Sequence, residues 1–353
     1  MRQVQQDKPE ADRPEATRPQ ATRPQATRPQ ATRPQATRPQ ATRPQATRPQ
    51  ATRPRATRPR ATRPRATRPW ALVLLLACLA TPAWSAELKV ATWNLEWLTA
   101  RPDGDRSLPS DAHPKRPEDI ITLAGYAAQL NADVIAIEEV DGREIAAKIF
   151  PPDHYSIHMT KDHVVQRVGL VVRRGLAYDV NPDLTALNVA GPHGPGHLRS
   201  GADITLHLPG GPLRILAVHL KAMCWRDVLP RDRPACNTLR AQLPPLQAWI
   251  AARRQEGVPF IVLGDFNRWM DGNDLVIATL RGAAPLARAT EGHLTSPCWG
   301  GERFIDHILA GGAAGQWMDP ATFSVMVYRE TGGEWKERLS DHCAVAVDFR
   351  QPD

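Results

Sequence analysis

A five-residue repeat near the N-terminus decides where in the chain a folded domain can lie. Between residues 16 and 70 the unit ATRPQ, later ATRPR, recurs eleven times. Each proline lacks a backbone donor and disfavours helix at the residue before it, and the units hold almost no apolar side chains. We therefore expect residues 1–69 to form a disordered or polyproline-like tail. Such an array is a spacer or anion-binding arm, an expanded coding repeat, or the product of a wrongly placed start codon.

The repeat also carries the positive charge of the chain. The formal net charge is +8, but residues 1–85 hold 17 basic and 4 acidic side chains, a balance of +13. The other 268 residues hold 28 basic and 33 acidic side chains, a balance of −5. Overall basicity is therefore no argument for a nucleic-acid or membrane partner of the folded part. A domain of this charge binds phosphates only through a local basic groove or a metal ion.

The segment after the repeat has the layout of an export signal. Arginines of the last units precede an apolar run at 70–80, which ends in the small residues of TPAWSA. The run is short for a membrane span, and a basic flank followed by such a run is typical of a signal peptide. We interpret residues 70–85 as a signal peptide cleaved after Ser85, which predicts a periplasmic or secreted protein. Lipid attachment at Cys78 and a buried core helix are the less favoured interpretations.

Four cysteines follow the signal segment, an even number that favours disulfides in an exported domain. They are Cys224, Cys236, Cys298 and Cys343. Three pairings are open, and Cys224 with Cys236 is favoured because both lie in one loop rich in proline, arginine and aspartate. Cys298 would then pair with Cys343. Unpaired structural thiols are the alternative, whereas long spacings without a CxxC motif argue against zinc.

Residues 86–353 are long enough for one large α/β domain. A helical stripe lies at 118–130 and a second helix at 238–254, where Pro244 and Pro245 should kink or restart it. Apolar runs predict strands at 88–95, 133–139, 168–172, 204–208, 213–220, 260–263, 304–309 and 344–349. This mixture of parallel-type and hairpin units predicts two packed sheets with helices outside.

Polar side chains gather at the ends of these apolar runs, where an α/β fold forms its site. Each alone is more often a cap or turn residue, but their number exceeds what turns need. They are Asn94, Glu139, His219, Asp265, Asn267, Asp306, Asp341 and His342.

The chemistry of this set suits hydrolysis of a phosphoester. Carboxylate and amide oxygens are ligands for Mg²⁺ or Mn²⁺, so we expect Asn94, Glu139 and Asp341 to hold such an ion. The ion would polarise a phosphate oxygen and stabilise the leaving oxygen. A histidine held by an aspartate is suited to deprotonate water.

The catalytic roles follow from the remaining members of the set. His342 with Asp306 fits the role of general base. Asp265 would orient the attacking water, and Asn267 would donate to the phosphate.

Six motifs in this order carry a family resemblance: ATWNLEWL, DVIAIEEV, HLK, GDFN, FIDHIL and SDHCAV. Together they resemble the endonuclease/exonuclease/phosphatase superfamily, whose type member is deoxyribonuclease I, across residues 88–349. The resemblance implies a four-layer α/β sandwich and divalent-metal hydrolysis of phosphoesters. It supports the roles given above and makes His219 the second catalytic histidine of the nuclease branch. The cysteine loop after HLK resembles that of exported bacterial members.

Three positions need comment against that pattern. Gln166 stands where nuclease members have a glutamate that pairs with the second histidine; it can orient His219 but cannot stabilise its charge. Residues 140–142 intervene before Arg143, so a phosphate contact from that side is in doubt. Glu138 stands where the family has glutamine, and strand alternation turns Glu138 and Glu139 to opposite faces, so Glu139 is taken as the ligand.

Three functions follow as hypotheses, with a monomer and no protein partner expected in each. The first is a nuclease for DNA or RNA, which needs a basic groove. The second is a sphingomyelinase-like or other small-molecule phosphodiesterase or phosphatase, with Trp225, Trp269 and Met270 as candidates for lipid contact. The third is a binding protein without catalysis, which the complete residue set disfavours. The candidate groove residues are Arg167, Arg199, Lys221, Arg226 and Arg240.

Overall fold

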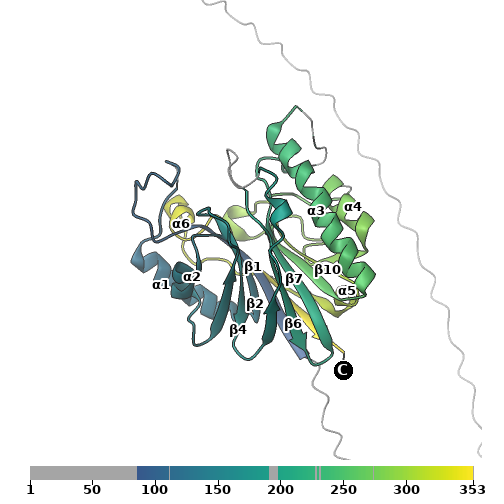
Figure 1. Cartoon of the computed structure of the whole chain (residues 1–353). Helices are drawn as coiled ribbons and strands as arrows, with labels where there is room; N and C mark the ends of the chain where they lie inside the picture. Colours follow the sequence, from purple (N-terminus) through teal and green to yellow (C-terminus); the bar gives the residue numbers. More distant parts are fainter. Residues whose placement is uncertain are drawn as a thin grey trace, which may run out of the picture. The chain divides into compact units, whose positions relative to one another are not determined.

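The computed structural model describes residues 86–110, 112–190, 198–226, 229, 232–272 and 274–352 (Figure 1). The expected tail at 1–69 and the expected signal peptide at 70–85, with Cys78, lie outside the described residues. The assignment of 86–353 as the folded domain agrees with where helices and strands are described, although its N-terminal boundary stays a prediction.

Twelve strands in the described part form two mixed sheets of six. Strands β1 and β2 are parallel, as are β7 and β8, and the other paired strands are antiparallel. The first sheet has the order β11 (Met318–Val325), β12 (Val345–Gln351), β1 (Ala86–Leu98), β2 (Val134–Val140), β4 (Arg167–Arg173) and β3 (Tyr155–Met159). The second has the order β5 (Ala177–Val180), β6 (Ala202–Leu208), β7 (Gly211–His219), β8 (Phe260–Asp265), β10 (Asp306–Gly311) and β9 (Leu286–Arg288).

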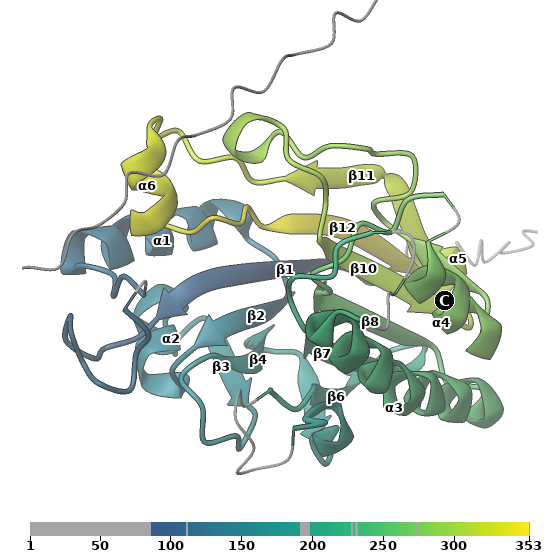
Figure 2. The same cartoon turned by 90° about the horizontal axis from the view of Figure 1, so that it is seen from above.

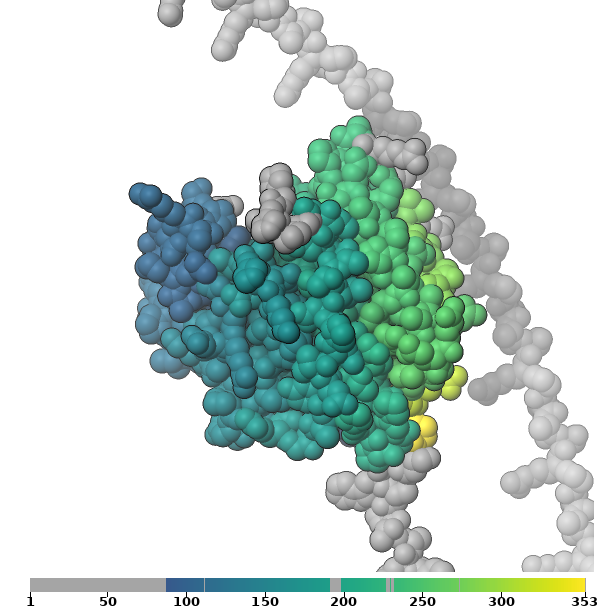
Figure 3. Space-filling view, in the orientation of Figure 1, coloured from purple at the N-terminus to yellow at the C-terminus, as the bar shows by residue number. Residues whose placement is uncertain are grey.

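Helices cover the outer face of each sheet and complete four layers, as predicted (Figure 2). Helices α1 (Pro117–Leu130) and α2 (Arg143–Ile149) pack on the first sheet, and α3 (Pro234–Glu256) and α4 (Leu275–Ala283) on the second. In the space-filling view the blue to teal half and the green half meet in one continuous surface (Figure 3). The short helices are η1 (Thr185–Leu187), η2 (Cys298–Gly300), α5 (Ala314–Trp317) and α6 (Gly333–Arg338).

Strand β2 shows why its sequence is almost continuously apolar. Val134 and Ala136 pack between the two sheets, whereas Ile135 and Ile137 pack under the helices of the first sheet. Side chains alternate across a strand, so a strand buried on both faces needs apolar residues at every position. Its C-terminal end, where the acidic residues begin, is therefore the first place where the pattern permits charge.

Helix α3 departs from the prediction that Pro244 and Pro245 would kink or restart it. The structure has one helix from Pro234 to Glu256 with both prolines inside. The prolines have no N–H to donate to the carbonyls of Arg240 and Ala241. These two residues are half-exposed and exposed, so water can bind their carbonyls instead. The buried stripe of the helix, including Leu239, packs in the core against the second sheet and holds the helix together across the prolines.

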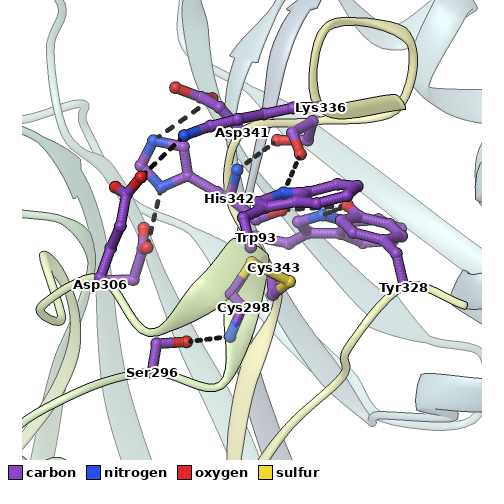
Figure 4. The surroundings of a disulfide bond; sticks show 12 residues. Trp93, Ser296, Cys298, Asp306, Tyr328, Lys336, Asp341, His342 and Cys343 are labelled. Atoms are coloured by element: carbon purple, nitrogen blue, oxygen red, sulfur yellow. Dashed lines mark hydrogen bonds and ion pairs between the residues drawn. A yellow bond between two sulfur atoms is a disulfide. The ribbon is translucent and has the colours of Figure 1, made fainter. Parts of the chain in front are cut away.

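Both predicted disulfides are present, Cys224–Cys236 and Cys298–Cys343. The second joins η2 to Cys343, two residues before the start of β12 (Figure 4). Its closed loop spans 45 residues, against 12 for the first.

Removal of the longer cross-link should cost the more stability. By chain entropy, serine at both Cys298 and Cys343 should lower the free energy of unfolding by about 4 kcal/mol, and serine at Cys224 and Cys236 by about 3 kcal/mol. Urea unfolding of the two double variants beside the wild type measures this. The reverse order would contradict the entropic account.

His307 in β10 also affects the stability of the fold. Its side chain is buried, and each ring nitrogen makes one hydrogen bond. Its Nε2 donates to the Arg268 carbonyl at 2.8 Å and its Nδ1 accepts from the Thr290 hydroxyl at 2.7 Å. Burial lowers the pKa of His307 to about 3, so the folded protein keeps the ring neutral.

The pKa of His307 predicts acid sensitivity. The unfolded chain takes up this proton near pH 6.5 and the folded chain only near pH 3. The contribution of neutral His307 to the free energy of unfolding is complete above pH 6.5. It is lost as the pH falls toward 3, by at most about 1.4 kcal/mol per pH unit. Chemical denaturation at several pH values between 4 and 7 gives the free energy of unfolding as a function of pH. This free energy should depend less steeply on pH in His307→Gln than in the wild type. Equal slopes would assign the acid sensitivity to other groups.

Candidate active site

The predicted site residues meet at one edge of the two sheets. Strands β7 and β8 run in parallel with His219 in register with Asp265, and antiparallel β10 places Asp306 in register with Asp265 on the other side. A cleft of about 1450 Å³ opens at this edge, and its walls include Glu139, His219, Asp265, Asn267 and Asp341. A smaller cavity, also lined by Asp341, contains Asp306 and His342.

The side chains of Asp306 and His342 point toward each other (Figure 4). Asp306 Oδ2 lies 2.8 Å from His342 Nδ1. The His342 backbone is fixed on both sides: its N–H donates to Ser340 Oγ at 3.0 Å, and its carbonyl accepts from the Tyr328 hydroxyl at 3.0 Å. That hydroxyl in turn accepts from Trp93 Nε1 at 2.9 Å, which ties the histidine to the core.

The Nε2 atom of His342 is the free end of this dyad. It lies 3.6 Å from Asp341 Oδ1 and 3.8 Å from Asp265 Oδ2. Burial alone would lower the pKa of His342, but the surrounding carboxylates of Asp306, Asp341 and Asp265 outweigh it and raise the pKa well above its ordinary value. A cation beside these carboxylates would weaken that effect and favour the neutral ring.

Asp265 is the centre of a hydrogen-bond network. Its Oδ2 accepts from Asn94 Nδ2 at 3.1 Å and Asn267 Nδ2 at 3.0 Å, and its Oδ1 accepts from the Asn267 backbone at 2.7 Å. Burial, with smaller effects from neighbouring charges, raises the pKa of Asp265 to about 7. Both amide hydrogens of Asn267 have acceptors, the other being the Leu220 carbonyl at 3.2 Å, so a substrate phosphate would have to displace one.

The glycine of the GDFN motif is required by the backbone. Gly264 has φ +142°, and a Cβ built there would lie 1.9 Å from the Val218 carbonyl oxygen. No other residue fits between β7 and β8 at this point. The close approach of the two strands keeps Asp265 beside His219.

Glu139 and Glu138 face opposite sides, as alternation predicted. Irregular register at the end of β2 and a positive φ of 60° turn Glu139 toward the cleft. Its carboxylate accepts from Asn94 Nδ2 and the Trp97 backbone, both at 3.3 Å. Glu138 is fully buried and accepts from Thr92 Oγ1 at 3.0 Å; burial raises its pKa well above the ordinary value.

Gln166 acts on Glu139 and not on His219, contrary to the sequence interpretation. Its Nε2 donates to Glu139 Oε2, and its Oε1 accepts from Arg199 Nη2 at 2.6 Å. His219 Nε2 lies 3.5 Å from Asp265 and 3.7 Å from Glu139, and its Nδ1 has no hydrogen-bond partner among the described residues. Burial, helped by the positive charge of Arg199, lowers the pKa of His219 well below its ordinary value.

Two charged residues of the site were missed by the sequence analysis. Glu96 Oε2 accepts from the Asp341 backbone at 3.2 Å and from Lys115 Nζ at 3.1 Å. Burial raises the pKa of Glu96 to about 7. Glu96 could have been suspected because it is a charge within an otherwise apolar motif two residues after Asn94. Lys115 lies in a loop before α1 and has no such signal.

The donor atoms fit a hard divalent cation. Asn94, Glu139 and Asp341 carry side-chain oxygens, and their assignment as the ligands stays a prediction. Asp265, Asp306 and His342 also offer ligand atoms that all lie within 4.8 Å of one another. Among the described residues, the buried Asp306 Oδ1 has no hydrogen-bond partner, so this oxygen is available to a cation.

Basic residues line the same cleft. Of the five expected from the sequence, Arg199, Lys221 and Arg226 are in its wall. Arg167 and Arg240 are not: the first pairs with Asp141 at 3.5 Å, and the second donates to Asn237 Oδ1 at 2.7 Å and to the Leu229 carbonyl. The wall also contains Arg233 and Arg303, which the sequence did not single out.

The four-layer sandwich and its cleft of carboxylates and histidines define a metal-dependent hydrolase of phosphoester bonds. The model of the Endonuclease/Exonuclease/phosphatase family matches residues 91–342. The chain belongs to this family.

Solved structures support the fold. TDP2 from C. elegans is 17% identical, with 75% of each chain covered and a TM-score of 0.51. A humanized TDP2 from D. rerio is 16% identical, with 75% of this chain and 99% of that chain covered and a TM-score of 0.50. No curated protein matches the chain. Among the described residues, every helix is too short or too polar to cross a bilayer.

Proposed function

We propose that the protein is an exported, Mg²⁺- or Mn²⁺-dependent phosphodiesterase that cleaves nucleic acid, most simply as an endonuclease. The observation that carries the proposal is the cleft itself, where positive side chains border the carboxylate and histidine set. Phosphate backbones bind to such clusters of lysine and arginine. The basic residues of the wall are Arg199, Lys221, Arg226, Arg233 and Arg303.

In the proposed reaction Asn94, Glu139 and Asp341 would hold the cation. When bound, it would polarise a phosphate oxygen and stabilise the leaving oxyanion. His342, oriented through Nδ1 by Asp306, takes a proton from the attacking water at Nε2. Asp265 orients that water.

Two further residues contact or prepare the substrate in this proposal. Asn267 exchanges one of its present acceptors for a phosphate oxygen. His219, kept neutral by burial and by Arg199, offers a hydrogen bond rather than a charge. It therefore stabilises the transition state by donating a hydrogen bond and not as a full general acid.

Export rests on two observations of different kinds. The segment 70–85 has the layout of a signal peptide. Two disulfides in the described part are typical of proteins from oxidising compartments. We propose that the mature protein begins at Ala86 in the periplasm or outside the cell.

The test is hydrolysis of supercoiled plasmid DNA and of bis-p-nitrophenyl phosphate by the purified protein, with Mg²⁺ or EDTA. Metal-dependent nicking that declines with rising salt would support the nuclease, since phosphate contacts release counterions. Intact plasmid beside cleavage of the small diester would move the assignment to a small-molecule or lipid-headgroup phosphodiesterase. No cleavage of either substrate would reject both.

The pH dependence of the reaction should reveal the Asp306–His342 dyad. Asp306→Asn removes a carboxylate that raises the pKa of His342, so the pH at which the base loses its proton should move down. The rate should also fall, because the ring loses its orienting carboxylate. Profiles of kcat/KM from pH 5 to 9 measure both effects, and an unmoved acidic limb would show that another group is the base.

A further inference from the structure

The cleft extends from the carboxylates to an aromatic wall. Trp225 and Trp269 both line it, together with His219 and Asp265. Their rings are stacked, with centroids 6.5 Å apart and planes inclined by 18°. Trp225 is 41% exposed although it is large and apolar, so its ring presents surface that nothing in the described part covers.

The aromatic pair is rigidly held. The disulfide Cys224–Cys236 closes the loop next to Trp225, and the Trp269 backbone donates to the Trp225 carbonyl at 2.7 Å. Arg268, fully buried, donates to the Cys224 carbonyl at 2.7 Å and pairs with Asp274. The backbone that carries both rings is therefore fixed before a ligand binds, which lowers the entropy lost on binding.

Two guanidinium groups border the same rings. Arg303 and Arg226 lie over Trp269, at 4.9 and 5.8 Å from the ring centroid. Arg303 is also paired with Asp271, which fixes its position. An aromatic surface with adjacent positive charge suits a ligand that has both a planar aromatic face and an anionic group.

The same features argue against lipid contact by Trp225, Trp269 and Met270. Met270 is only 1% exposed, so it cannot enter a bilayer. The rings form a wall of the cleft that also holds the catalytic carboxylates.

We propose that Trp225 and Trp269 form a stacking subsite for a nucleobase next to the scissile phosphate, with Arg226 and Arg303 beside the neighbouring phosphate. The subsite rests on the proposed nucleic-acid hydrolysis and adds the form of the substrate to it. A base inside a duplex is covered on both faces, so the substrate segment at this position is unpaired.

The test measures binding without turnover. Labelled single-stranded oligonucleotides, one intact and a set each lacking one base, are titrated in Mg²⁺ with the full chain carrying His342→Ala, and anisotropy is recorded. At one position the loss of the base should weaken binding about tenfold. Adding Trp225→Ala should abolish that difference, and Trp225→Phe should retain part of it, which separates stacking from misfolding. Trp335→Ala is the control, since Trp335 is a tryptophan beside an arginine, Arg338, but lies outside the cleft.

The outcomes are distinct. If the wild-type protein cuts oligonucleotides but no missing base affects binding, or if Trp225→Ala leaves the difference unchanged, the subsite is rejected and the nuclease function remains. If Trp225→Ala instead weakens binding to phosphatidylcholine vesicles only, the tryptophans contact membrane and the proposal is wrong. If the wild-type protein neither binds nor cuts any oligonucleotide, the proposed function itself fails and the subsite with it.

Discussion

His342→Ala is expected to lower metal-dependent hydrolysis of bis-p-nitrophenyl phosphate by about 10²- to 10⁴-fold, the range of general base catalysis. The reason is its place in the site. Its Nδ1 is held by Asp306 at 2.8 Å, and its Nε2 is directed toward the space between Asp265 and Asp341. Among the described histidines, only His342 both pairs with an aspartate and lines the smaller cavity that contains Asp306.

A loss of activity in His342→Ala through misfolding must be distinguished from a loss of the catalytic base. The His342 side chain is bordered by three carboxylates, so its loss leaves their mutual repulsion less balanced, and a small loss of stability is expected. His307→Gln is a suitable control, because it removes a buried histidine that lines neither cavity. A rate for His342→Ala within tenfold of the wild-type rate, under conditions where both are folded, would exclude this histidine as the base.

The strands that the sequence predicts are the interior strands of the two sheets. The four that it misses, β3, β5, β9 and β11, each form an edge of a sheet. Interior strands are covered on both sides and need runs of apolar residues, whereas an edge strand can be short, polar or interrupted by proline, as β11 is at Pro320. Hydrophobic periodicity therefore predicts the interior strands of each sheet but not the edge strands.

The same limit applies to the site. Its carboxylates, asparagines and histidines end apolar strands, so motif order was sufficient to find them. Their partners come from loops: Arg199 holds Gln166, and Lys115 holds Glu96. Loop residues acquire such roles only from the three-dimensional path of the chain. This is why Gln166 was assigned to His219 when its side chain in fact reaches Glu139.

The second large effect is expected at Glu139. Glu139→Gln should weaken divalent-metal binding about 10-fold or more and lower hydrolysis at fixed Mg²⁺ by at least the same factor. The carboxylate accepts from Asn94, from the Trp97 backbone and from Gln166. The glutamine has the same shape but loses the negative charge, and its amide nitrogen cannot accept from the donors at one of the two oxygen positions. Titration of activity with Mg²⁺, and of Mn²⁺ binding by calorimetry, measures the two effects separately.

Glu138→Gln is the matched control for this prediction, since it makes the same chemical change one residue away. Glu138 is fully buried, and burial raises its pKa well above the ordinary value, which favours the neutral acid. An amide has the same shape as the carboxylic acid and carries no charge. Metal affinity should therefore change little in Glu138→Gln and fall in Glu139→Gln. Equal losses in both variants would contradict the role of Glu139 as a direct ligand, because a direct ligand must distinguish two adjacent glutamates of which only Glu139 lines the cleft.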